Sequence, residues 1–158
     1  MAKGPRPFLG LLAGVAAGLV ASAAMAAFQS QAQKLLPESE EDPATIKAAD
    51  KASAIVTGEP VPKRYRDSSG QLVHYLTGAA LGGVYGVLTE YRAEASAGFG
   101  SAFGIATSAL LDEVAVPAAD LGPAPQDTPL AIHAYGAASH LVYGWVLEGV
   151  RALIAGRR

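Results

Sequence analysis

The segment 72–91, LVHYLTGAALGGVYGVLTEY, repeats a small or ionisable residue at every fourth position. Residues four apart lie on one face of an α-helix. That face would carry His74, Gly78, Gly82, Gly86 and Glu90. Each glycine weakens a helix in water by about 1 kcal/mol relative to alanine, whereas in a bilayer glycines let two helix backbones pack closely. We therefore predict a membrane-spanning helix in a tightly packed bundle.

Three further segments have the same character, at 8–28, 95–116 and 130–154. The first contains no charge over 21 residues, about the length that crosses a hydrocarbon core of roughly 30 Å. In each segment, glycines spaced by four or eight residues form a ridge along one helix face. These ridges are Gly10, Gly14 and Gly18 in 8–28, Gly100 and Gly104 in 95–116, and Gly136 and Gly144 in 130–154. Only 16% of the residues are charged, against roughly 25% in ordinary soluble domains. The sequence predicts an all-α integral membrane four-helix bundle, with residues 1–158 forming one membrane domain.

The first segment has an alternative interpretation as a secretory signal peptide. It has a basic start, an apolar middle and Ala-x-Ala patterns at 21–23 and 24–26, which are the features of a cleavable leader. The uninterrupted glycine ridge and the three later apolar segments favour a retained helix.

The polar segment 29–71 is the one long loop that this prediction requires. Asp42 followed by Pro43 is typical of a helix start, and Gly58 is typical of a helix end. We expect a short helix between them, lying on the membrane surface or on the bundle. The alternative is a partly ordered loop.

The basic residues predict the orientation of the helices. With four spans, one side of the membrane would receive Lys3, Arg6, Arg92, Arg151, Arg157 and Arg158. The loop 113–129 on the other side contains no Lys or Arg, whereas the long loop 29–71 on that side contains six, which its seven acidic residues offset in net charge. Because cytoplasmic loops are enriched in these residues, we expect both termini in the cytoplasm of a bacterium, with the chain in the inner membrane.

The second and fourth segments also resemble each other. Residues 74–84 align with 140–150, pairing His74 with His140 and Gly78 with Gly144. The first and third segments share their glycine ridge, so a duplicated helical hairpin is one explanation.

Ionisable residues share the helix faces with these glycines. They are costly inside a membrane, by roughly 2.5–3.5 kcal/mol, and usually face the bundle interior. We predict a polar pathway of His74, Glu90, Asp112, His140 and Glu148. His140 and Asp112 would form a proton- or cation-responsive pair in the non-cytoplasmic half, near His133, and Glu148 and Glu90 would be the inner acceptors.

Each of these residues also has a structural explanation. His74 and Glu90 lie near the predicted interfaces, where polar side chains act as anchors. Asp112 and Glu113 could mark a helix end that meets water. His140 and Glu148 lie deeper, where an interhelical hydrogen bond would account for them.

Nothing in the sequence requires a cofactor. The chain contains no cysteine, which excludes disulfides and thiolate metal sites. Haem ligation by His74 and His140 is conceivable, but no other residue supports it, so we predict no cofactor, metal or catalytic residue. The net charge of −2 argues against nucleic acid. The expected partners are membrane lipids and either a second copy of the chain or another membrane protein.

The region 72–155 resembles the YagU-like bacterial inner-membrane proteins of unknown function. The resemblance rests on His74, on Tyr85 and Glu90, on a Pro117 loop, and on HLVYGWVLE at 140–148 followed by Arg151. It implies a link to acid tolerance and supplies no catalytic residues. We therefore expect a non-enzymatic protein of pH or ion homeostasis, the alternative being a scaffold or accessory subunit of a membrane complex.

Overall fold

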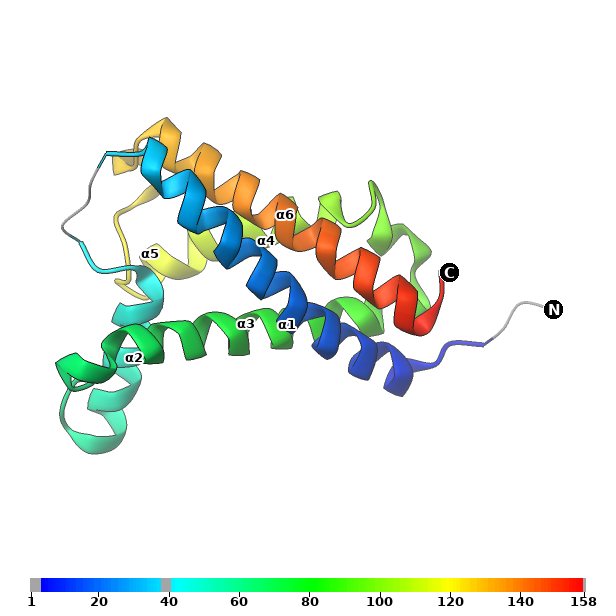
Figure 1. Cartoon of the computed structure of the whole chain (residues 1–158), viewed down its shortest axis with the longest axis horizontal. Coiled ribbons are helices and arrows are strands. Elements are labelled where there is room, and N and C mark those ends of the chain that lie inside the picture. Colours follow the sequence, from blue (N-terminus) through cyan, green and yellow to red (C-terminus); the bar gives the residue numbers. More distant parts are fainter. Residues whose placement is uncertain (1–3, 38–40, 158) are drawn as a thin grey trace.

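The computed structural model describes residues 4–37 and 41–157, and all regular structure in this part of the chain is helical. The long helices are α1 (Pro7–Ala32), α3 (Arg66–Tyr91) and α6 (Leu130–Ala155), and the shorter ones are α2 (Ala44–Thr57), α4 (Ser101–Leu110) and α5 (Val116–Ala118). A π-helical turn, η4 (Leu111–Ala115), joins α4 to α5. Short 3-10 turns are η1 (Gln33–Leu35), η2 (Lys63–Tyr65), η3 (Ala93–Ser96) and η5 (Pro125–Asp127). Figure 1 shows α1 crossing α3 and running beside α6.

The third predicted segment, 95–116, differs most from the structure. Its helix begins only at Ser101 and changes to a π-helical turn at Leu111. Gly98, Phe99 and Gly100 all have positive φ, at 62°, 56° and 83°, a region that a right-handed helix cannot include. In the described residues α1, α3 and α6 are therefore unbroken, whereas the predicted helix 95–116 is divided into α4, a π-helical turn and α5.

α1 and α3 pack through their glycines. A β-carbon on Gly14 would collide with the backbone carbonyl of Gly82, and one on Gly82 would collide with that of Gly14. Gly10 likewise faces Gly86, and Gly18 faces Gly78. The helices are thus antiparallel and touch backbone to backbone, which is the contact that small residues allow between membrane helices.

α4 and α6 repeat this contact. Gly100 faces Gly144, and Gly104 faces the backbone carbonyl of His140. Gly144 therefore meets a facing glycine of α4, as Gly78, Gly82 and Gly86 each meet a facing glycine of α1. The two hairpins thus pack in the same manner.

The core between the hairpins consists mainly of small side chains. Ala17 and Ala21 of α1 are fully buried, together with Tyr85 and Leu147 from the neighbouring helices. The Tyr143 hydroxyl, also buried, donates a 2.6 Å hydrogen bond to the backbone carbonyl of Gly78. This bond ties the second hairpin to the first.

α2 is held on α3 by charge. Arg66 donates to the carboxylates of Asp50, at 2.6 Å, and of Asp42, at 2.8 Å. The Arg66 hydrogen bond holds the pKa of the Asp50 carboxyl below its usual value. α2 begins at Ala44 with Pro43 as its cap, one residue later than predicted, which leaves Asp42 to bind Arg66. Gly58, the predicted stop, ends the helix with φ 83°.

We expect Gly82→Ala to lower the stability of the protein by about 1–3 kcal/mol or more, the usual cost of overpacking. The new methyl group would meet the rigid backbone of Gly14. Gly83→Ala is the matched control, because its methyl would lie 3.0 Å from Leu11 Cδ1 and 3.1 Å from Val15 Cγ2, side-chain atoms that can move. Thermal unfolding of both variants tests this, and equal melting temperatures would contradict it.

Candidate functional site

A buried ion pair lies in the C-terminal half of α6. Arg151 donates from Nε to Glu148 Oε2 and from Nη2 to Oε1, both at 2.8 Å. The Tyr85 hydroxyl of α3 donates to the same Oε2 at 2.8 Å. The side chains of Glu148 and Arg151 are only 5% and 1% exposed. Glu148, predicted to be a free inner acceptor, is therefore a carboxylate with three donors.

Glu90 is held in a similar way at the same end of the bundle. The backbone N–H of Arg6 donates to Glu90 Oε2 at 2.7 Å, and Arg6 Nη2 lies 3.2 Å from Oε1. Arg6 Nη2 also donates to the backbone carbonyl of Ala155 at 2.6 Å. The Glu90 side chain is fully buried. Arg6 thus joins the start of α1 to the ends of α3 and α6.

The sequence did not predict that arginines pair with Glu90 and Glu148. The arginines served to predict orientation and, in the case of Arg151, to support the family resemblance. The Glu148–Arg151 pair had a readable signal, because residues three apart on a helix are neighbours. The Glu90–Arg6 pair had none, since 84 residues separate the two. Each carboxylate is held by an arginine that also contacts a neighbouring segment, so both glutamates have a structural role at this end.

A second polar cluster joins η4 to α6. His133 Nδ1 lies 2.7 Å from Glu113 Oε1, and His140 Nε2 lies 3.4 Å from Asp112 Oδ2. The hydroxyl of Ser108 donates to the same oxygen of Asp112 at 2.9 Å. We call these residues the two histidine–carboxylate pairs. The sequence predicted the partnership of His140 with Asp112, but not that of His133 with Glu113.

The π-helical turn brings both acids to α6. Asp112 and Glu113 are consecutive residues, whereas His133 and His140 are seven apart on one helix. In an α-helix, consecutive side chains point about 100° apart, so one regular helix would aim only one acid at that face. The π-helical turn at Leu111–Ala115 lets both reach it. Such turns are frequent at functional sites.

The imidazole of His140 is incompletely paired. Its Nδ1 is buried and has no hydrogen-bond partner among the described residues. A buried polar atom without a partner destabilises the fold by about 1–3 kcal/mol. A pocket of about 210 Å³ lies beside the pairs and is lined in part by Ser108, Glu113 and His133. The pocket thus reaches the His133–Glu113 pair from outside, whereas the unpartnered nitrogen belongs to the buried His140.

His74 lies apart from both clusters. Its Nε2 is 3.1 Å from the backbone carbonyl of Ser22 on α1. His74 and His140 thus have separate partners on different helices, and the structure gives no support to joint ligation of haem. In the described ranges no group of three or more His, Asp or Glu side chains is placed to hold a metal ion.

Five residues were predicted as one pathway, and the structure divides them. Glu90 and Glu148 lie at one end with arginines, Asp112 and His140 lie between α4 and α6, and His74 lies with Ser22. The middle of α1 and α6 contributes Ala17, Ala21 and Leu147 to the core. The same core also contains the hydroxyl groups of Tyr85 and Tyr143, and the contacts of the five residues fall into two polar clusters and a separate His74.

We expect Arg151→Met to destabilise the protein by about 3–5 kcal/mol, because it leaves the Glu148 charge buried without its partner. The double variant Arg151→Met/Glu148→Leu should recover most of this loss, since replacing a whole buried pair is often neutral. Unfolding by heat or denaturant measures both. A double variant no more stable than Arg151→Met would show that Glu148 is not the reason for the loss.

No protein-family model matches the chain, and neither a curated protein nor a solved structure matches it. A function for the chain therefore has to come from its own residues: the arginine-paired glutamates, the two histidine–carboxylate pairs, and the surface that surrounds them.

Proposed function

We propose that the chain is a non-catalytic, four-helix inner-membrane protein that responds to protons at its two histidine–carboxylate pairs and so supports pH or ion homeostasis. One observation carries the membrane part of the proposal. Within 8–28, 72–91, 101–115 and 130–154, every exposed residue is apolar or aromatic, and every ionisable residue is buried or half-buried. A helical bundle in water would have the opposite arrangement.

The outer face of α3 illustrates this arrangement. Its exposed residues include Leu72, Leu76, Ala80, Val84 and Leu88. They form an apolar ridge opposite the glycines. Two helical segments, Pro7–Leu35 and Lys63–Tyr91, are long and apolar enough to cross a membrane. α6 carries more polar residues, but Glu148 and Arg151 neutralise each other inside the bundle, which lowers the cost of placing them in lipid.

The arginines support the proposed orientation. Arg6 contacts the C-terminal ends of α3 and α6, and Arg92 and Arg157 follow those two helices in the chain. By the preference of basic residues for the cytoplasmic side, this end and both termini would face the cytoplasm. Lys3 and Arg158, which support the same orientation, lie outside the described residues. The bacterial inner membrane itself follows from the YagU-like resemblance.

The histidine–carboxylate pairs support the proton response. Histidine is the side chain that ordinarily titrates between pH 5 and 8. Protonation of His140 or His133 would place a new positive charge next to Asp112 or Glu113 at the α4–α6 contact. This contact is also where the helix is irregular, so a change of charge there acts on the least regular part of the bundle. The proposed response replaces a relay through Glu90 and Glu148, which arginines occupy.

In the scaffold alternative, a partner protein would contact a different surface from the glycine faces. The ridges Gly10–Gly18, Gly78–Gly86 and Gly100–Gly104 are filled within the chain itself. A partner protein would therefore contact the outward Leu and Val side chains, and glycine substitutions would disrupt the fold before they disrupted a complex.

The membrane part is tested by cell fractionation. After lysis without detergent, we expect the protein to float with membranes in a density gradient and to stay with them after an alkaline carbonate wash, because its outer surface is apolar. Flotation also distinguishes membranes from aggregates. Recovery in the soluble fraction would reject the proposal.

The proton response is tested through the single tryptophan. The Trp145 indole N–H donates to Ser101 Oγ at 2.7 Å and so bridges α6 and α4. We expect the emission of Trp145 to change between pH 8 and pH 5 in the wild-type protein. His140→Gln should reduce this change, because it removes one of the two histidine rings of the proposed response.

His74→Gln is the control, since His74 pairs with a backbone carbonyl on another helix and its loss should leave the emission change intact. In cells, His140→Gln should lower survival at acid pH while His74→Gln does not. A His140→Gln protein that keeps both the emission change and acid survival at normal expression would overturn this part of the proposal.

A further inference from the structure

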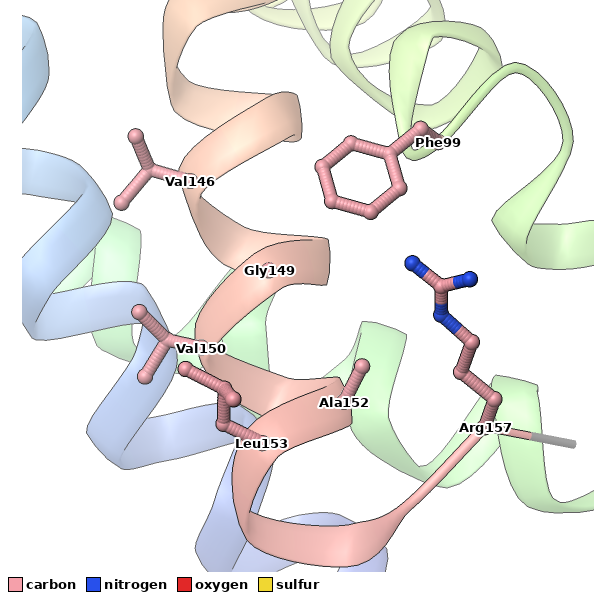
Figure 2. A pocket seen from close by; sticks show the side chains of 7 residues that line it. All are labelled: Phe99, Val146, Gly149, Val150, Ala152, Leu153 and Arg157. Atoms are coloured by element: carbon pink, nitrogen blue, oxygen red, sulfur yellow. The ribbon is translucent and has the colours of Figure 1, made fainter.

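A groove runs along the C-terminal half of α6 and has a volume of about 470 Å³. Gly149 and Ala152 lie in its middle, with Val146, Val150 and Leu153 on one side. On the other side lie Phe99, from the loop before α4, and the guanidinium of Arg157 (Figure 2). The groove is therefore apolar along its length and positively charged at one end.

We propose that this groove binds one anionic phospholipid, with an acyl chain along α6 and the phosphate on Arg157. The inference rests on the membrane location proposed above. From Val146 to Leu153 the helix rises roughly 10 Å, enough for a substantial part of one acyl chain. Arg157 lies one turn beyond Leu153, at the end of the bundle where a headgroup would meet water.

The positive charge of Arg157 at the end of the groove favours an anionic lipid. Arg6 and Arg151 are neutralised by Glu90 and Glu148. Among the described residues, Arg157 instead lies over the Phe99 ring, whose centre is 5.8 Å from its guanidinium carbon. It forms no ion pair with a residue of the described part of the chain. A lipid phosphate supplies the missing negative charge, as in basic pockets on the cytoplasmic side of other membrane proteins.

The backbone at Phe99 positions one wall of the groove. Phe99 has φ 56°, a left-handed conformation that is unfavourable for an aromatic residue and typical of functional sites. Its ring lies close to Gly149, because a β-carbon on Gly149 would already be in ordinary contact with Phe99 Cζ, at 3.6 Å. Phe99 and Gly149 therefore form adjoining walls of the groove, and an acyl chain would lie against them rather than between them.

The experiment uses the full-length protein in a neutral detergent, with binding of phosphatidylglycerol and of phosphatidylcholine measured by native mass spectrometry and by the shift in melting temperature. The wild-type protein should bind phosphatidylglycerol at least tenfold more tightly than phosphatidylcholine. Arg157→Gln should reduce this preference to near one, because it removes the charge and keeps the groove. Gly149→Leu should weaken the binding of both lipids, because it fills the groove.

Arg64→Gln is the matched control. Arg64 also lies over an aromatic ring, 4.6 Å from the centre of Tyr65, but at the start of α3 and away from the groove, so its loss should leave the lipid preference unchanged. An unchanged preference in Arg157→Gln, or an equal loss in Arg64→Gln, would overturn the inference. Arg157 is exposed, so this result does not depend on whether Gly149→Leu folds. A protein that floats with membranes but shows no lipid preference would reject the groove and leave the membrane location standing.

Discussion

Backbone contact between α1 and α3 is the constraint on which the rest of the structure depends. Where Gly14 meets Gly82, no side chain fits between the helices. The α1 side of the core beside this contact therefore consists of small residues such as Ala17 and Ala21, against which Tyr85 and Leu147 pack, while many other large apolar side chains are exposed. The surface composition that supports a membrane location is thus a consequence of how closely the helices approach.

The polar side chains of the bundle fall into two clusters of different chemistry. At one end, arginines neutralise Glu90 and Glu148, and arginine keeps its proton at any physiological pH. Between η4 and α6, histidines face Asp112 and Glu113, and histidine is the side chain that ordinarily titrates near neutral pH. The proposed proton response would therefore act on one cluster and leave the other fixed.

The sequence predicted the helical class and the glycine faces, because a four-residue spacing is a local property of a helix. Gly82 and Gly144 could be assigned to contacts for that reason. The break at Phe99 and the π-helical turn could not, since both depend on how α4 meets α6. The distance of Arg6 from Glu90 along the chain hid that pair, whereas Glu148 and Arg151 could have been paired by their spacing alone.

The two hairpins pack in the same manner but carry different residues at their contacts. In the first, Gly78, Gly82 and Gly86 all face glycines of α1, whereas in the second Gly144 faces Gly100 and the next contact is the backbone carbonyl of His140 against Gly104. The second hairpin is also where the helix becomes irregular and where a buried imidazole nitrogen has no partner among the described residues. The histidine–carboxylate pairs therefore lie where a histidine interrupts the run of glycines on the contact face.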